Sequence, residues 1–488
     1  MKGLSLICLC TAAGLAYSPA VLSAAPDIRD TVKVQNSERL SAAESAADIS
    51  CNVDSTAVLL NDTSGTWTLR RCIEYALVEN ISLQKSRIAV DDANVDIKTA
   101  KGALFPSLSF STSHSVINRP YQESSATVSG TEILESNSNT SYTGNYGLNA
   151  QWTVYNGGRN RKTIRQEELN TRIAELDVSS TANDIMESIA QTYIQILYAN
   201  ESVDVNRNTL EVSTAQLERG KELLASGSIS RADYAQLESQ VSNDKYQLVT
   251  AQTTLQDYRL QLKQLLEIEG EPEMDLLLPE IGDETVLSPL PDKEMVYRSA
   301  LGIRPEIQAG ELNVEASELG IRIARSGYIP TLSVSAGIGT NHTSGTDFTF
   351  TEQIRNGWNN SIGLTLNVPI FSNRQTKSAV EKARLQLKTS ELDLKESRKE
   401  LYKTIESLWM DAWSSQLQYT AAIENLKSSQ ASYDLVSEQF GLGMKNTVEL
   451  LTEKNNLLSA EQEVLQAKYM AVLNIQLLKF YSGQEITL

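Results

Sequence analysis

"KGALFPSLSFSTS", residues 101–113, decides the fold, because its pattern returns as "RSGYIPTLSVSAG" at residues 325–337. Pro106 and Pro330 stand at equivalent places, and polar and apolar residues alternate after each of them. A proline followed by such an alternation predicts the point where a helix gives way to a strand. The two copies lie 224 residues apart.

The repetition extends over most of the chain. "ALVENISLQ" from Ala76 and "ALGIRPEIQ" from Ala300 are also 224 residues apart. "GLNAQWTVY" from Gly147 and "GLTLNVPIF" from Gly363 are 216 apart, so a loop before them is about eight residues longer in the first copy. A collinear series of matches predicts that one structural unit is present twice.

The segments after the two prolines have a strict period of two, which is typical of strands. In "SLSFSTSHSV", Leu108 and Phe110 share one face, while serines form the other. Small and amide residues on the polar face are what a water-filled lumen requires, and each segment is long enough to cross a bilayer as a tilted strand. A soluble sandwich would show the same alternation, but the sequence offers no further strands to cover the apolar faces. Four strands are predicted, at about 104–117, 144–156, 328–341 and 360–371.

Two long segments, 159–219 and 371–440, contain neither Gly nor Pro. They are rich in good helix formers, and helices of this length are rods on the order of 90–105 Å. Such rods are stable only when they pack side by side, as in coiled coils. Shorter helical segments follow at 228–269 and 444–482, after the glycine-bearing breaks "ASGSIS" and "FGLGMKN". We expect each long helix to form an antiparallel hairpin with the shorter one.

The N-terminal part has the features of an exported protein. Lys2 precedes an apolar run and then small residues, which predicts a secretory signal peptide at residues 1–24 with cleavage after Ala24. Residues 25–66 form a polar segment without a clear element. No later stretch approaches 18 consecutive apolar residues, so no membrane-spanning helix is expected.

Cys51 and Cys72 are the two cysteines outside the predicted signal peptide. A pair in an exported chain favours a disulfide, which would stabilise by about 3 kcal/mol in the chain-entropy model. The alternative is two unlinked thiols.

Several kinds of chemistry are absent from the sequence. A net charge of −18 does not suit a nucleic-acid partner, which needs a basic surface. There is no phosphate-binding GxxxxGK[ST] motif and no cysteine spacing typical of a metal site. His114 and His342 are the only histidines, and we expect them far apart, on a strand and in a polar loop. We therefore predict no catalytic site, no cofactor and no metal.

Four strands do not close a membrane barrel, which needs about eight or more. Open strand edges cannot face lipid, because each unsatisfied backbone group there costs several kcal/mol. Either the protein is not in a membrane, or several copies pool their strands in one ring.

The chain resembles the TolC family of outer-membrane channel-tunnel proteins, also called outer membrane efflux proteins, over about residues 67–482. The resemblance rests on "GALFPSLSFS" and "SGYIPTLSVS", on the corners "VYNGGRNR" and "PIFSNRQT", and on the turns "LLASGSISRADYAQLE" and "QFGLGMKNTVELLTE". It implies a mixed fold of long α-helices and membrane β-strands, in which a homotrimer forms a twelve-stranded outer-membrane barrel and a periplasmic helical tunnel. The two repeats would be 67–269 and 293–488, with 270–292 linking them at the equator of the tunnel.

The resemblance also implies a function. Such a protein is a passive exit duct in the Gram-negative outer membrane, contacting outer-membrane lipid. It works with a periplasmic adaptor and an inner-membrane partner, either a proton-driven RND-type pump or an ABC transporter. Drug efflux and type I secretion are both open. The alternatives are a structural or adhesive trimeric coiled-coil protein of the outer membrane and a soluble periplasmic coiled-coil adaptor.

The family closes its tunnel with residues just after the hairpin turns. By resemblance, Asp233 and Glu449 are the acidic gate positions, Lys445 a basic one and Phe440 an aromatic one. Thr452 stands where the family often has a second acid. Three copies of Glu449 about an axis would favour cations, and a link from Lys445 to Asp233 of an adjacent hairpin would hold the closed state. Ordinary solvated helix charges are the alternative.

The turn glycines have a second expected role. The family meets its adaptor at the open hairpin tips, which assigns Gly227, Gly441 and Gly443 to this contact. Simple turn chemistry explains the same glycines.

Overall fold

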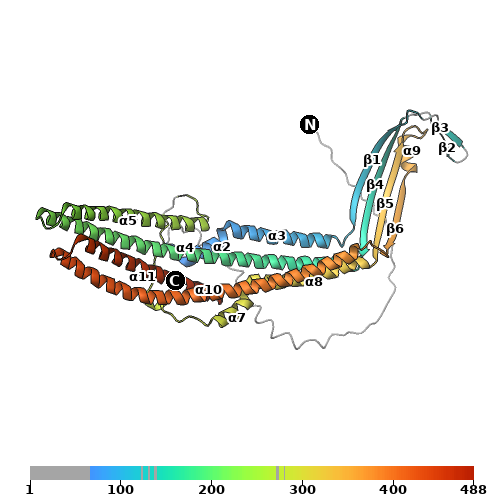
Figure 1. Ribbon diagram of the computed structural model, residues 1–488. Coiled ribbons are helices and arrows are strands. Elements are labelled where there is room, and N and C mark those ends of the chain that lie inside the picture. Colours follow the sequence, from blue (N-terminus) through green and yellow to red (C-terminus); the bar gives the residue numbers. More distant parts are fainter. Residues whose placement is uncertain are drawn as a thin grey trace. The chain divides into compact units, whose positions relative to one another are not determined.

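The computed structural model describes residues 66–487, apart from 122–124, 130–131, 137–139, 271–273 and 280. The chain divides into Met1–Gly65 and Thr66–Leu488, and the second unit is described by itself (Figure 1). The predicted signal peptide, the polar segment up to residue 65 and Cys51 lie outside the described residues.

The same order of elements occurs twice within this unit. The first series is α2 (Leu69–Glu79), α3 (Ile81–Gly102), β1 (Ser107–Asn118), β4 (Thr140–Tyr155), α4 (Arg159–Ala225) and α5 (Arg231–Leu265). The second is α7 (Lys293–Ile303), α8 (Pro305–Arg325), β5 (Thr331–Thr343), β6 (Asn359–Asn367), α10 (Gln375–Gly441) and α11 (Thr447–Tyr481). Additional short elements are β2 (Ser125–Ser129), β3 (Glu132–Ser136), α6 (Asp283–Val286), the 3₁₀ turn η1 (Ser326–Tyr328) and α9 (Phe350–Asn356).

Equivalent residues end the first helix of each series. Asn80 has an extended backbone between α2 and α3, and its side-chain oxygen accepts hydrogen bonds from the amides of Ser82 and Leu83. Arg304 takes the same place between α7 and α8, where Pro305 occupies the first helical position. An N-cap side chain and an N1 proline are two ways of accommodating the unpaired amides at a helix start.

The four long strands form one antiparallel sheet in the order β1-β4-β5-β6 (Figure 1). Phe110 pairs with Leu148, and Leu148 in turn pairs with Ile338, so apolar side chains continue across the sheet on one face. The predicted alternation is confirmed, but the strand limits differ. β1 begins at Ser107 because the amides of Leu104 and Phe105 still donate to carbonyls of the preceding helical turn.

The two loops that the sequence presents as polar and irregular contain structure. In the first loop, β2 pairs with β3 as an antiparallel hairpin. The second loop contains α9, which begins with a reciprocal capping box between Thr349 and Glu352. The T-x-x-E spacing is a known helix-start signal and would have predicted this helix.

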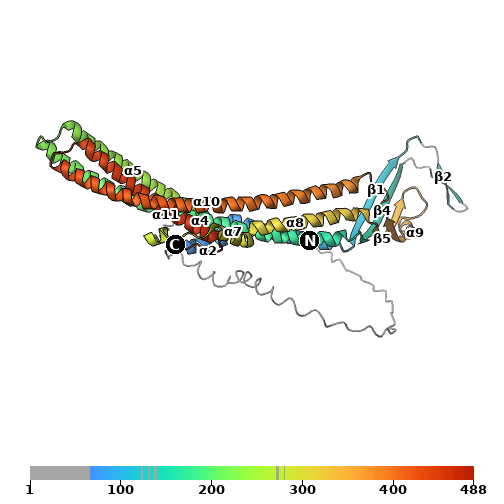
Figure 2. The same cartoon turned by 60° about the horizontal axis from the view of Figure 1, so that its bottom comes forward.

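The long helices extend slightly past the predicted limits. α4 continues through Gly220 to Ala225, because Gly220 faces the side chain of Leu237 on α5 and leaves room for it. Figures 1 and 2 show α5 beside α4 and α11 beside α10, so each long helix and the helix that follows it form a hairpin. The main hydrophobic core joins these hairpins near the middle of α4 and the C-terminal ends of α5 and α11, through the buried residues Ile189, Tyr193, Ile196, Leu262 and Ala471.

The segment that links the two series packs on the middle of the long helices. The Gln416 amide nitrogen on α10 donates to the Val286 carbonyl at 2.8 Å, and the Trp409 indole donates to the Pro291 carbonyl at 3.1 Å. Trp67 forms an isolated parallel bridge with Leu276. Across the described part of the chain, no helix has both the length and the apolar character needed to cross a bilayer.

Candidate functional site

Both hairpin turns have the same geometry. Gly227 and Gly443 have φ values of 74° and 73°, the left-handed region in which glycine pays no steric penalty. After Gly227, the Ser228 amide donates to the Leu223 carbonyl at 2.8 Å, and the equivalent bond in the second turn links Met444 to Gln439 at 2.9 Å. These are Schellman-type ends, and the backbone conformation itself favours glycine at both positions. Gly441 has a packing role, because the guanidinium of Arg219 lies against it.

Asp233 lies in the first turn of α5 and stabilises the start of that helix. One of its carboxylate oxygens accepts hydrogen bonds from the Ser230 hydroxyl at 2.7 Å and from the Ser230 amide at 3.1 Å. The Ser230 hydroxyl in turn accepts from the Asp233 amide at 3.1 Å, which completes a capping box. The hydrogen bonds from Ser230 hold the pKa of Asp233 below its ordinary value, so the carboxylate is charged at neutral pH.

Glu449 takes the equivalent place in α11. Its amide donates to the Asn446 side chain at 2.9 Å, and its carboxylate lies 3.0 Å from the Lys445 ammonium. Lys445, which precedes the N-cap Asn446, therefore pairs with the first turn of α11 in its own hairpin. The expected link from Lys445 to Asp233 concerns adjacent hairpins and stays a prediction.

Phe440 and Thr452 have local partners. Phe440 is 4% exposed and packs with Leu237 and Leu450 in a small apolar cluster at the hairpin tips. Thr452 donates its hydroxyl to the Val448 carbonyl of the same helix at 2.8 Å. In this conformation Phe440 packs between the two hairpins of one chain. The Thr452 hydroxyl already donates to a backbone carbonyl of its own helix.

A buried charged cluster lies behind the turns, and the sequence analysis did not find it. Lys454 of α11 pairs with Asp244 of α5, and both side chains are almost inaccessible to water. The Lys454 ammonium also donates to the Ser213 hydroxyl on α4, and the Gln240 amide donates to Asp244 at 2.8 Å. Three helices from both hairpins thus meet at one ion pair. Nothing in the sequence separates Lys454 from the solvated lysines of the same helices.

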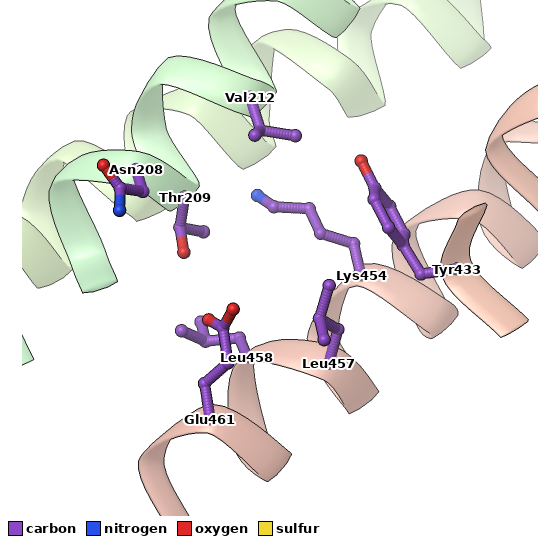
Figure 3. Close-up of a pocket in the computed structure, with 8 residues that line it drawn as sticks. All are labelled: Asn208, Thr209, Val212, Tyr433, Lys454, Leu457, Leu458 and Glu461. Carbon is purple, nitrogen blue, oxygen red and sulfur yellow. The ribbon is translucent and has the colours of Figure 1, made fainter. Parts of the chain in front are cut away.

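A small pocket lies beside this cluster, between α4, α10 and α11 (Figure 3). Figure 3 shows the Lys454 side chain extending from α11 toward Thr209 and Val212 of α4. Burial lowers the pKa of Lys454, and the Asp244 carboxylate acts in the opposite direction. Glu461 also lines the pocket, and burial raises the pKa of its carboxyl above the ordinary value. At the same level, the Gln216 amide of α4 donates to the Tyr433 hydroxyl of α10 at 2.6 Å.

The placement of the histidines corrects the sequence analysis. His342 belongs to β5 and not to a loop, and it is not far from His114 of β1. Gly144 of β4 pairs with His114 on one side and with His342 on the other. Both imidazoles lie over this glycine.

Cys72 is completely buried in the core that joins the helical hairpins. Burial raises the pKa of its thiol to about 12. Because Cys51 lies outside the described residues, a disulfide between the two stays a prediction.

The comparisons with known proteins identify the family. The model of the outer membrane efflux protein family matches residues 72–267 and again residues 296–484. The chain belongs to the outer membrane efflux protein family. This confirms the predicted TolC-like resemblance and the location in the Gram-negative outer membrane. The family is one of transport channels.

Relatives in this outer membrane efflux protein family cover most of the chain. The outer membrane efflux protein BepC of Brucella suis biovar 1 (strain 1330) is 21% identical over 424 residues, which are 86% of this chain and 87% of BepC. The alkaline protease secretion protein AprF of Pseudomonas aeruginosa is 22% identical over 386 residues, 78% of this chain and 77% of AprF. A solved structure of the outer-membrane channel OprN matches with a TM-score of 0.70 at 18% identity, covering 86% of this chain and 90% of OprN.

Proposed function

We propose that three copies of the chain form a continuous export duct, with a twelve-stranded barrel in the outer membrane and a helical tunnel in the periplasm. The observation that carries this proposal is an open sheet with an exposed apolar face. Among the described residues, β1 and β6 each pair with only one long strand, so both sheet edges are available to other copies. Four strands do not close, whereas three sets of four make a ring of a size common in outer-membrane barrels.

The apolar face of the sheet is too exposed for an isolated soluble chain. Phe110 is 69% exposed, Ile362 is 86% exposed and Leu364 is 69% exposed. Large contiguous apolar patches of this kind are typical of membrane or protein contacts. Contact with outer-membrane lipid would cover this face, because it continues over all four strands.

The opposite face suits a wet lumen. The Asn149 amide donates to the Ser111 hydroxyl at 3.4 Å, and the Asn145 amide donates to the Ser113 hydroxyl at 3.3 Å. Gly337 and Gly363 lie on the same face, where the absence of a side chain leaves more open space above the sheet. A lumen lined in this way would pass polar cargo without binding it tightly.

The repeated architecture fits the same proposal. The bounds of α4 and α5 recur in α10 and α11 after 216 residues, and the bounds of α2 recur in α7 after 224. The family model also matches twice. We infer that the two repeats, 67–269 and 293–488, arose by duplication, and that each contributes two strands and one helical hairpin to the duct.

The hairpin tips would then form the periplasmic entrance. Asp233 and Glu449 are charged residues in the first turns of α5 and α11, so three copies would place six carboxylates around the axis. This arrangement would favour cations and narrow the entrance. The adjacent turns, with Gly227, Gly441 and Gly443, would meet a periplasmic adaptor that belongs to an RND-type pump or an ABC transporter.

Drug efflux and protein secretion both need an exit duct through the outer membrane, and the proposal includes both. BepC is named for efflux and AprF for the secretion of alkaline protease. A duct that is wide and passive leaves the choice of cargo to its inner-membrane partner. An adhesin or a soluble adaptor is not favoured, because the family is one of outer-membrane channels.

Membrane fractionation followed by conductance tests the proposal. The protein should be recovered with the outer membrane on a sucrose gradient, and the purified protein should give discrete channels in a planar bilayer. Recovery in the soluble periplasm, or the absence of any channel from correctly folded protein, would contradict it.

A further inference from the structure

The two histidines of the chain form a site that the duct function does not use. In the sheet, His114 of β1 and His342 of β5 flank Gly144 of β4 on the same face. Because glycine has no side chain, both rings lean over it. A Cβ atom at position 144 would lie 2.7 Å from the Nδ1 atom of His342 and 3.1 Å from the Nδ1 atom of His114. Two imidazole nitrogens therefore face one small space.

The contacts of His114 indicate which of its two ring nitrogens carries the proton. The Nε2 atom of His114 lies 3.1 Å from the Thr112 hydroxyl, which can accept its proton. Nδ1 is then unprotonated, and its lone pair accepts from the Tyr142 hydroxyl at 2.7 Å. A bound ion would take the place of that hydroxyl proton between the two atoms. A partner that fixes the tautomer from the outer side is the arrangement found around metal-binding histidines.

His342 provides the second, independent observation. Its Nδ1 atom is buried and has no hydrogen-bond partner among the described residues. Buried polar atoms in folded proteins are nearly always paired, so an unpaired ring nitrogen facing another imidazole requires an explanation. A bound ion would supply the missing partner.

Aromatic rings enclose the space on several sides. Tyr142 and Tyr146 stand two residues before and after Gly144, and their ring centroids lie 5.1 and 6.1 Å from that of His342. Phe350 of α9 packs on His342 from the loop side, at 4.9 Å between centroids. These rings shield the Nδ1 atom of His342 from water, whereas the side chain of His114 stays accessible to an ion from the outer face of β1.

We propose that His114 and His342 bind a divalent first-row transition-metal ion such as Zn²⁺, with the Tyr142 oxygen as a further ligand after its hydroxyl proton is released to solvent. Imidazole nitrogen suits zinc and copper, whereas calcium and magnesium require several oxygen ligands that are absent among the described residues here. The ion ties β1, β4 and β5 together at the loop ends of the strands. The site lies on the apolar face and goes beyond the proposed transport function.

Isothermal titration of the full protein with Zn²⁺ tests the proposal. The protein must carry a tag without histidine, which makes the test specific, because the chain has no third histidine. We expect one Zn²⁺ per chain, saturable binding, and no binding of Mg²⁺. His114→Gln and His342→Gln should each abolish binding, and Thr112→Val should weaken it about tenfold or more through the lost outer hydrogen bond.

Gly144→Ala is the sharpest variant, because it keeps both histidines and fills the space between them. It should abolish Zn²⁺ binding. Gly147→Ala on the same strand is the matched control, since a Cβ atom there meets only ordinary contacts at 3.4 Å or more, and it should bind as the wild type does. Saturable binding that survives Gly144→Ala or either histidine substitution would overturn the proposal.

A second measurement needs no variant and is insensitive to folding defects. The Cu²⁺ complex of the wild-type protein should show couplings to two imidazole nitrogens in its electron paramagnetic resonance spectrum. A spectrum without nitrogen couplings, or the absence of saturable Zn²⁺ binding by the wild type, would mean that the residues are only a packed aromatic cluster.

Discussion

Lys454 of α11 and Asp244 of α5 form an ion pair that is buried between the two helical hairpins of one chain. Their side chains are 4% and 2% exposed, so neither charge has access to bulk water. Ser213 of α4 is the third member, and it belongs to the same hairpin as Asp244. The pair therefore fixes the position of the second hairpin against the first, just behind the turns proposed to form the entrance.

Removal of one partner should loosen this junction. Lys454→Met leaves Asp244 buried without a counter-charge, which costs about 3–5 kcal/mol. Faster hydrogen exchange of α5 and α11 on both sides of the pair is the expected readout. Lys445→Met is the control, because it removes the exposed Lys445–Glu449 pair and should cost at most about 1 kcal/mol.

The double variant Lys454→Met, Asp244→Leu refines the same test. It replaces both charges by apolar groups, so most of the lost protection should return. If Lys454→Met exchanges as slowly as the wild type does, the pair does not hold the hairpins.

The partly buried carboxyl of Glu461 should make the free energy of unfolding depend on pH. Burial raises the pKa of its carboxyl, so the folded protein favours the neutral form and the carboxylate destabilises it at pH 7. The stabilising contribution of the neutral form is present below the unfolded pKa of about 4.5 and is lost as the pH rises through the folded value. Glu461→Gln should therefore raise the thermal unfolding temperature at pH 7 and have little effect at pH 4.

Thermal unfolding followed by circular dichroism at pH 7 and at pH 4 compares Glu461→Gln with the wild type. Glu463→Gln, on the exposed side of the same helix, should change neither temperature much. An unchanged or lowered unfolding temperature of Glu461→Gln at pH 7 would show that Glu461 is not buried in the assembled protein.

The proposed entrance charges predict ion selectivity. Asp233→Asn removes charge and keeps an oxygen atom that can still accept from Ser230, and Glu449→Gln removes charge without touching the Asn446 cap. Cation preference in planar bilayers should fall in each variant, and most in the double variant. Glu396→Gln, an exposed acid far along α10 from the turns, should keep the wild-type selectivity. Unaltered conductance and selectivity in the double variant would remove Asp233 and Glu449 from the entrance.

The elements of the fold were readable in the sequence because each has a local cause. The period of two around Leu108 and Phe110 predicted a strand, and the absence of Gly and Pro over 159–219 predicted a long helix. α9 was missed, although its Thr349–Glu352 capping box is a local signal.

The charged cluster and the histidine site had no such signal. Lys454 and Asp244 lie 210 residues apart, and only the packing of two hairpins brings them together. His114 and His342 meet because of strand register, which local alternation does not determine across long connections. The gate assignments came from resemblance alone, and the structure adds that Asp233 is also a helix cap and that Phe440 is a packing residue.

Substitutions of the turn glycines can measure how much these residues stabilise the turn, independently of any contact with an adaptor. A Cβ atom on Gly227 or Gly443 meets no neighbour, so the cost of Gly→Ala there is purely conformational, about 1–2 kcal/mol. Gly302→Ala is the matched control, because it is equally uncrowded but lies in the regular helix α7, and it should stabilise by about 0.4–1 kcal/mol. Thermal unfolding compares the three variants.

Substitution by asparagine distinguishes a role of these glycines in the turn conformation from a role in adaptor contact. Gly227→Asn and Gly443→Asn tolerate the left-handed conformation and keep the turn. If the turns also contact an adaptor, the asparagine variants should fold normally and yet lose export. Export at the wild-type level in well-folded asparagine variants would assign the glycines to turn chemistry alone.

Native mass spectrometry of the protein extracted from the outer membrane tests the central claim most directly. The account requires that each chain contribute four strands to a ring that no single chain can close. It predicts one species with the mass of three chains, and it predicts that no folded single chain is released under gentle conditions. A stable folded monomer, or a dimer as the main species, would contradict the account.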